Sequence, residues 1–366
     1  MPSRRAASLV LAFAASAIAS VVACAPSSDA GGASESDIGT KPPRAWAPAP
    51  PKTGNLRIAE YNIRNFPNDV MGAPDAGEAG AAGDGGAAEP DRDTRPALVR
   101  KQNETDEGAL VDILEKLDFD LLAVEEINDT VRFDAVLARL GERTGRSYQS
   151  VYSLAWEHPQ HTGIIVRTDR LRIESPKVHG EIATRPTMRA GLSARVVSTK
   201  NGGVDFGILV LHLASGDSPS RATFRAEQAR FAGKVVTERQ AELGDRDFLV
   251  VGDMNTARES QELPAFDTAI GDEGKSGLTR QPPDLACSTY YTKGPQNPVL
   301  QPSFIDNVYF ASMEERDVSV PVTVGAHCFE RSCQPFESDS AEHGTSYWSV
   351  SDHCPVYFEI ADVDRD

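Results

Sequence analysis

The sequence predicts an α/β fold, because short apolar runs typical of buried strands are mixed with segments of helical periodicity. Phe248 to Val251 is a four-residue apolar run, short enough for a core strand. Residues 110–117 place leucine and isoleucine at i, i+3, i+4 and i+7, which is one face of a helix. No repeat of solenoid length interrupts this mixture, so the α/β class fits best.

Composition limits the ways in which the chain could bind its partners. Its 366 residues suffice for two average domains or one large domain, and 40% hydrophobic content is ordinary for a globular protein. The formal net charge of −17 argues against broad affinity for nucleic acid or anionic membranes through a basic surface. A nuclease stays open, because metal ions in a site can supply the positive charge that phosphates need.

The first 24 residues read as an export signal. Arg4 and Arg5 precede an apolar run over residues 6–23. Residues 21–24, Val-Val-Ala-Cys, resemble the lipobox of bacterial lipoproteins, in which the signal is cut before the cysteine. Cys24 is then the lipidation site, and the protein is anchored on the periplasmic or cell-surface side. A plain secretory signal and a short anchoring helix are the alternatives, and each also takes the chain out of the cytoplasm.

Four further cysteines indicate disulfides outside the cytoplasm, where three pairings are open to them. They are Cys287, Cys328, Cys333 and Cys354. A local bridge between Cys328 and Cys333 is plausible because only four residues separate them, and Cys287 would then pair with Cys354. Zinc binding is the competing interpretation. It is disfavoured because there is no CxxC pair and His327 is the only histidine next to Cys328 and Cys333.

Two segments read as flexible. Residues 25–53 are rich in Pro, Ala, Ser and Gly, which predicts a tether. Met71 to Pro90 is low-complexity sequence of Gly, Ala and acidic residues, which predicts a disordered insertion within a loop. The folded domain is therefore expected over residues 54–362, beginning with a strand at Leu56 to Ile63.

The other elements follow from apolar periodicity and from residues that start or stop helices. A strand is expected at Phe119 to Ile127, and a helix around residues 133–140 with Gly141 as its stop. A helix is expected to begin at Ser218-Pro219-Ser220. Residues 267–300 are rich in turn formers and predict no clear element. Further strands are expected at 162–166, 192–197, 206–213, 248–251, 304–310 and 355–360.

Polar residues occur in or beside the predicted apolar strands. They are Asn62, Glu125, Glu126, His212, Asp253, Asn255, Asp306, Asp352 and His353. Such groups are costly to bury unless they converge on something. Any one of them could be an ordinary turn residue, but the whole set is not explained in that way. Carboxylates, amide oxygens and two histidines together indicate Mg²⁺ or Mn²⁺ beside acid and base groups, with Ca²⁺ as an alternative structural ion.

The segments that carry these residues resemble the endonuclease/exonuclease/phosphatase superfamily, in the family's order. They read IAEYNIRNF, DLLAVEEIND, GIIVR, LVLHLAS, LVVGDMNT, SFIDNVYF and SDHCPV, from Leu56 to Ile360. GDMN and SDHCPV are the most specific of them. The resemblance implies a four-layer α/β sandwich, in which two stacked, mostly antiparallel sheets are flanked by helices and the site lies at one end.

The resemblance also implies which residues hold the metal and the water. Asn62, Glu126 and Asp352 would position the ion. Glu126 is preferred over Glu125 because it occupies the place of the family's glutamate. Asp253 would orient or deprotonate the attacking water.

Three further residues are implied on the phosphate side. Asn255 would contact the phosphate or a second metal. His353 would hold the phosphate or act as general acid–base, paired with Asp306, since a carboxylate fixes an imidazole's tautomer and raises its pKa. His212 resembles the second histidine of the deoxyribonuclease, sphingomyelinase and inositol phosphatase branches. Its orienting carboxylate is not evident in the sequence, with Glu157 as the candidate.

Arginines near these segments are candidates to bind phosphate. Arg221 and Arg225 follow His212 by nine and thirteen residues, and Arg185 precedes Pro186. A solvated helix face explains Arg221 and Arg225 equally well.

The predicted function is an exported, metal-dependent phosphodiester hydrolase, with nucleic acid as the favoured substrate. A sphingomyelinase-type phospholipase, a phosphomonoesterase and a catalytically inactive binding lipoprotein are the alternatives. The acidic insertion at Met71 to Pro90 disfavours long polyanions such as duplex DNA. We expect a monomer that contacts the membrane only through its lipid anchor and has no protein partner.

Overall fold

The computed structural model describes residues 44–67, 104–257, 260–292, 299–337 and 345–365. The predicted signal, Cys24 and the predicted insertion at residues 71–90 lie outside these ranges. Within them, no helix combines the length and apolar character that are needed to span a bilayer.

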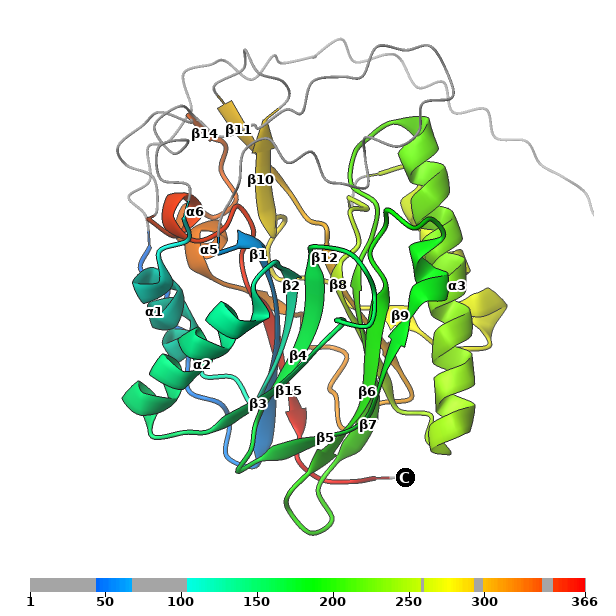
Figure 1. Cartoon of the computed structure of the whole chain (residues 1–366), viewed down its shortest axis with the longest axis horizontal. Helices are drawn as coiled ribbons and strands as arrows, with labels where there is room; N and C mark the ends of the chain where they lie inside the picture. The colour runs from blue at the N-terminus through cyan, green and yellow to red at the C-terminus, as the bar shows by residue number, and fades with distance from the viewer. Residues whose placement is uncertain (1–43, 68–103, 258–259, 293–298, 338–344, 366) are drawn as a thin grey trace, which may run out of the picture. The chain divides into compact units, whose positions relative to one another are not determined.

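Two six-stranded sheets form the centre of the fold (Figure 1). The first has the order β13-β15-β1-β2-β4-β3, with β1 (Asn55–Phe66), β2 (Leu121–Ile127), β3 (Tyr148–Tyr152), β4 (His161–Arg167), β13 (Thr323–Val324) and β15 (Val356–Ala361). The second has the order β5-β6-β7-β8-β12-β9, with β5 (Leu171–His179), β6 (Gly191–Ser198), β7 (Asp205–His212), β8 (Phe248–Asp253), β9 (Thr279–Arg280) and β12 (Asp306–Ala311). Pairs β1–β2 and β7–β8 are parallel, and the other pairs are antiparallel.

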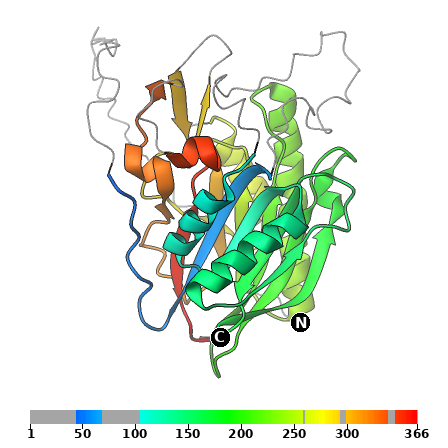
Figure 2. The same ribbon diagram turned by 60° about the vertical axis from the view of Figure 1, so that its left-hand side comes forward.

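Helices cover the outer face of each sheet, so the α/β class and the four-layer sandwich are confirmed (Figures 1 and 2). Helices α1 (Glu107–Leu117) and α2 (Thr130–Thr144) pack on the first sheet, and α3 (Pro219–Leu243) and α4 (Leu263–Ile270) on the second. The remaining elements are the 3₁₀ helices η3 (Gly180–Ala183) and η4 (Asp272–Gly274), the strands β10 (Thr289–Thr292), β11 (Val299–Ser303) and β14 (Phe336–Glu337), and the helices α5 (Ala326–Arg331) and α6 (Thr345–Ser349). The three strands form a small third sheet.

The alternation of side chains along each strand builds the layers. Ile58 and Leu121 face the core between the sheets, whereas their neighbours Ala59 and Leu122 face α1 and α2. Leu249 likewise faces the inner core, and the outer face of β8 packs on α3 and α4. Because the inner faces of both sheets are apolar for most of their length, polar groups on them stand out at the strand ends.

Helix termini follow local backbone chemistry. Ser218 caps α3, its side chain accepting the N–H of Arg221, with Pro219 in the first turn, as predicted. The predicted stop of α2 at Gly141 is wrong. The helix continues to Thr144, and Gly145, in the left-handed conformation (φ 70°), donates its N–H to Gly141.

Part of the predicted tether packs on the domain. Trp46 is buried against Gly325 and Tyr357, and the Arg57 guanidinium donates to the carbonyl of Ala49. The folded domain therefore begins before Asn55, because burial of the large apolar indole of Trp46 holds this part of the proline-rich segment against the domain. The turn-rich residues 267–300 also contain short strands, which a periodicity argument cannot resolve.

The cysteines pair as Cys287–Cys333 and Cys328–Cys354, so the local Cys328–Cys333 bridge is wrong. Cys328 lies on α5, and Cys333 lies just beyond its end, where positive φ angles at Ser332 and Cys333 turn the chain. The two cysteines therefore bond to different partners although only four residues separate them, and the expected Cys287–Cys354 bridge is also wrong. Proximity in the sequence was therefore a poor guide to pairing.

Candidate active site

Three of the predicted residues lie side by side on the second sheet. In the strand register His212 is opposite Asp253, and Asp253 is opposite Asp306. All three side chains are buried and follow the apolar inner face of their strands. The site therefore lies at one end of the space between the two sheets.

Residues of the first sheet meet them there. The Asn62 amide nitrogen donates to Glu126 Oε1 (3.1 Å) and to Asp253 Oδ2 (3.2 Å), which joins the two sheets. Glu126 adopts a positive φ of 61°, at an irregularity in the pairing of β2 with both neighbours. Its Oε2 accepts the N–H of Asn65 (2.9 Å). These contacts bring Glu126 beside Asn62 and Asp253.

Asp306 and His353 form the predicted carboxylate–imidazole pair. His353 Nδ1 lies 2.9 and 3.0 Å from the two carboxylate oxygens of Asp306, and its Nε2 lies 3.9 Å from Asp253 Oδ2. Burial alone would lower the pKa of His353, but the negative charge and hydrogen bond of Asp306 raise it well above its usual value. Burial raises the pKa of Asp253 to about 7, opposed by the charge of His353. The histidine is therefore protonated near neutrality, beside a carboxyl that titrates there.

His212 stands in a different environment from the predicted one. Its Nε2 lies 3.6 Å from Glu126 and 3.5 Å from Asp253, while its Nδ1 has no hydrogen-bond partner among the described residues. Glu157 is exposed and does not orient it, so that candidate is wrong. Burial, followed by the charge of Arg189, lowers the pKa of His212 well below its usual value. His212 is therefore neutral in this structure.

Asn255 and Asp352 are half-buried and lie at the edge of the candidate site. Asn255, also at positive φ (50°), donates its amide to the carbonyl of Leu213 (3.1 Å), and its N–H donates to Asp253. Asp352 forms an ion pair with Arg64 (2.7 Å), which sequence reasoning missed. Both residues therefore stand next to the predicted site residues.

The donor set fits a divalent cation. Carboxylate oxygens of Glu126 and Asp253 lie within 4.8 Å of each other and of a nitrogen of His212, and carboxylate oxygens of Asp253 and Asp306 lie equally close to each other and to a nitrogen of His353. The carboxylates Glu126, Asp253, Asp306 and Asp352 would repel a phosphate that entered without a counter-charge. Oxygen-rich clusters of this kind suit Mg²⁺ or Mn²⁺.

Known proteins show what this architecture is similar to. No protein-family model matches the chain, and no curated protein matches its sequence. The truncated TDP2 of Caenorhabditis elegans is similar over 84% of this chain and 97% of its own, at 16% identity and a TM-score of 0.50. A Bacteroides thetaiotaomicron endonuclease/exonuclease/phosphatase family protein (84% and 97% coverage, 15% identity, TM-score 0.48) and the human Nocturnin catalytic domain (85% and 95%, 15%, 0.47) are also similar.

The chain has the endonuclease/exonuclease/phosphatase fold. At this level of identity the likeness concerns the fold, and the chemistry must be argued from the residues themselves.

The three candidate arginines differ in their surroundings. Arg225 is buried, and its guanidinium donates to the carbonyls of Ala214 and Gly216 and to Glu262. These contacts hold the loop after His212, which does not fit a phosphate contact. Arg185 is exposed and stacks on Phe224 with its guanidinium carbon 4.3 Å from the ring centroid, and Arg221 lies 6.0 Å from the same ring.

A second polar bridge between the sheets was also missed. Gln160 donates to Asn65 Oδ1 (2.8 Å) and accepts from Arg189 (3.0 Å). Arg189 in turn donates to the carbonyls of His212 and Leu213. No pattern in the sequence marks Gln160 or Arg189, because they lie in connections between strands.

Gly252, in the GDMN motif, is required by space. It has a φ of 135°, and a Cβ there would lie 1.9 Å from the carbonyl oxygen of Leu211 and 3.0 Å from Glu125. The glycine lets β7 and β8 approach closely just before Asp253.

Glu60 and Glu125 form a buried carboxyl pair beneath the site. They lie on adjacent strands, meet no other hydrogen-bond donor among the described residues, and are close enough to share a proton. Burial, and then neighbouring carboxylates, raise the pKa of Glu60 well above 4.5; burial also raises the pKa of Glu125.

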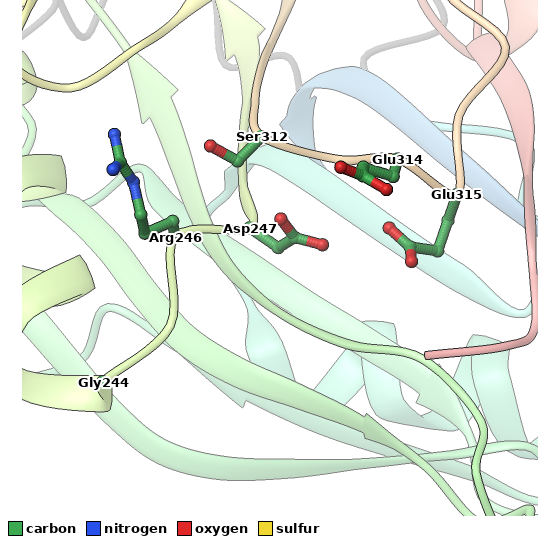
Figure 3. A pocket seen from close by; sticks show the side chains of 6 residues that line it. All are labelled: Gly244, Arg246, Asp247, Ser312, Glu314 and Glu315. Atoms are coloured by element: carbon green, nitrogen blue, oxygen red, sulfur yellow. The ribbon is translucent and has the colours of Figure 1, made fainter. Parts of the chain in front are cut away.

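A cavity of about 570 Å³ lies elsewhere (Figure 3). It is at the opposite ends of β8 and β12, lined by carboxylates including Asp247, Glu314 and Glu315. The predicted residues do not reach it.

We predict that Glu60→Gln stabilises the protein at alkaline but not at acidic pH. The pKa of Glu60 is higher in the folded state than its unfolded value of about 4.5, so folding above that pH takes up a proton. The free energy of unfolding of the wild-type protein therefore declines as the pH rises. Glutamine keeps the hydrogen bond without the proton. The free energy of unfolding in EDTA should rise by about 1–3 kcal/mol at pH 8 and change little at pH 4.5.

Chemical denaturation at both pH values measures this, with the exposed Glu337→Gln as control. An equal loss of stability at both pH values would contradict the prediction.

Proposed function

We propose that this chain is a metal-dependent phosphodiester hydrolase that acts on nucleic acid. The observation that carries the proposal is the convergence of two clusters on Asp253. One contains the fixed Asp306–His353 pair, and the other contains Glu126 and His212. A turn of unrelated polar residues would not place an oriented imidazole, a titrating carboxyl and metal-type ligands within reach of one another.

The residues suit in-line attack of water on phosphorus. A bound divalent ion would neutralise charge that builds on the phosphoryl oxygens, with Glu126, Asp352 and the side chain of Asn62 as its surroundings. Asp253 orients the water and accepts its proton. His353, kept protonated by Asp306, donates a proton toward the leaving oxygen. His212, being neutral, donates a hydrogen bond to the phosphate from Nε2, with its proton on that nitrogen.

The choice of nucleic acid is supported by the ledge of Arg185, Phe224 and Arg221. Phe224 packs near Ala214, two residues after His212, so the ledge lies beside the site. A pocket of about 350 Å³ next to it is lined by Trp156, Arg185 and Phe231, among others. Guanidinium groups suit the phosphates of a strand, and aromatic rings suit its bases. Because the net charge of the whole chain is −17, the positive charge of Arg185 and Arg221 is confined to this part of the surface.

A phospholipase is the second candidate. Exposed apolar side chains lie near the same end of the sandwich, at Val131 (79% exposed), Leu154 (60%) and Tyr291 (43%). Each follows a segment that contributes to or adjoins the site, and together they could touch a lipid surface. They are scattered on three segments, which supports this candidate less than the ledge supports a nuclease.

We further propose that the protein is exported and held at the membrane by a lipid on Cys24. Two disulfides in the folded domain are in keeping with an oxidising compartment.

Replacement of His353 tests the activity. Purified protein is assayed with Mg²⁺ or Mn²⁺ on single-stranded DNA, plasmid DNA, RNA, sphingomyelin vesicles and inositol phosphates. His353→Ala should lower kcat by about 10²- to 10⁴-fold, because the proton donor is lost, and EDTA should abolish turnover. The control is His179→Ala, a buried histidine that binds Ser193 and Glu181. Activity unchanged by both EDTA and His353→Ala would refute the proposal, and activity on sphingomyelin alone would favour the second candidate.

Replacement of the ledge arginines tests the substrate. Arg185→Ala with Arg221→Ala should raise KM for single-stranded DNA about tenfold at low salt and flatten its salt dependence, with little change in kcat. Arg172→Ala, an arginine on β5 paired with Glu174, is the matched control. Equal effects on DNA and on a small phosphodiester would contradict a strand-binding role.

Lipidation is tested by labelling cells with radioactive palmitate. The wild-type chain should carry label and sediment with membranes, and Cys24→Ala should do neither, because the acyl acceptor is missing. Labelling that persists in Cys24→Ala would rule out this anchor.

A further inference from the structure

Ser288 connects the two segments that carry the catalytic pair. It is fully buried. Its hydroxyl oxygen accepts the N–H groups of Ile305 (3.1 Å) and Asp306 (3.2 Å), and its carbonyl accepts the N–H of Cys354 (2.8 Å). One residue thus contacts the backbone of Asp306 and the residue next to His353.

The two residues after Ser288 extend this connection. The Thr289 hydroxyl (3.0 Å) and the Tyr290 N–H (3.2 Å) donate to the carbonyl of Asp352, and Thr289 pairs with His353 in an antiparallel bridge. Residues 288–290 therefore run along the whole Asp352–Cys354 segment.

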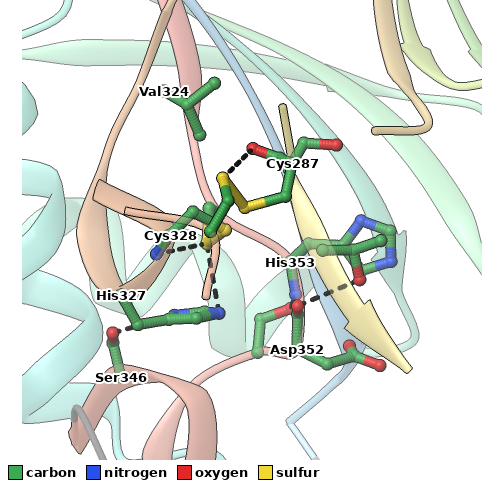
Figure 4. The surroundings of a disulfide bond; sticks show 12 residues. Cys287, Val324, His327, Cys328, Ser346, Asp352 and His353 are labelled. Carbon is green, nitrogen blue, oxygen red and sulfur yellow. Dashed lines mark hydrogen bonds between the residues drawn. A yellow bond between two sulfur atoms is a disulfide. The ribbon is translucent and has the colours of Figure 1, made fainter. Parts of the chain in front are cut away.

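Both disulfides border this arrangement (Figure 4). Cys287, immediately before Ser288, is bonded to Cys333, and Cys354, immediately after His353, is bonded to Cys328. The N–H of Cys328 also donates to the Cys354 sulfur (3.1 Å). One disulfide thus anchors the segment that begins with Ser288, and the other anchors the segment that contains His353. The hydrogen bond from Cys354 to Ser288 joins these two segments.

We propose that Ser288 is a positioning residue that keeps Asp306 and His353 at hydrogen-bonding distance. It touches none of the reacting groups and acts through the backbone of Asp306 and Cys354. Without its hydroxyl, two buried N–H groups lose an acceptor that they share, and the start of β12 must shift to satisfy them. Displacements of about 1 Å in such a site cost about 10²-fold in rate.

Ser288→Ala is tested by kinetics and by proton NMR. The kinetic arm rests on the proposed function: kcat should fall about 10- to 100-fold, with KM within about twofold of wild type, because substrate contacts are untouched. The spectroscopic arm does not need activity. The downfield Nδ1–H resonance of His353, assigned by its loss in Asp306→Asn, should shift or broaden in Ser288→Ala.

The matched control is Ser276→Ala, another buried serine whose hydroxyl contacts the backbone, at Ile270 and Leu278. It should leave kcat and the resonance unchanged. Ser288→Thr keeps an accepting hydroxyl and should retain at least about half of the wild-type kcat; it serves if the alanine variant does not fold.

Several outcomes would overturn the proposal. The kinetic ones are a kcat within twofold of wild type in Ser288→Ala and a folded Ser288→Thr that has lost turnover. The spectroscopic ones are a wild-type spectrum without a downfield resonance that is lost in Asp306→Asn, and such a resonance that Ser288→Ala leaves unchanged. An inactive wild type would instead count against the proposed function, and the resonance alone would then decide the role of Ser288.

Discussion

The hydrogen bond between Asp306 and His353 joins the two halves of the sandwich. Asp306 begins β12 of the second sheet, and His353 precedes β15 of the first. The Asn62–Asp253 contact crosses between the same sheets. Because the inner faces are apolar elsewhere, the sandwich can bury these polar groups only where they satisfy one another or meet an ion. The same contacts thus close the end of the fold and form the site.

The sequence predicted the parts of the site that lie on strands. An apolar run followed by a polar residue locates a strand end, and β7, β8 and β12 place His212, Asp253 and Asp306 in neighbouring register. The segments around Asn62 and Glu126 were located in the same way. These positions can be predicted because the alternation of side chains along a strand and their burial depend on a few adjacent residues.

The remainder depends on contacts between distant segments. The guanidinium of Arg225 binds carbonyl groups of the loop after His212, and no local pattern in the sequence indicates these contacts. Helix α5 and the turn after it decided the pairing of Cys328 and Cys333. Gln160 and Ser288 lie in connecting segments that carry no periodicity, so their contacts with the site could not be anticipated.

The two disulfides that border Ser288 and His353 tie the surroundings of the Asp306–His353 pair to the redox state of the compartment. Thiols in a reducing cytoplasm do not form such bonds, so a newly made chain would lack both covalent supports beside its acid–base pair. Full geometry would be reached only after oxidation.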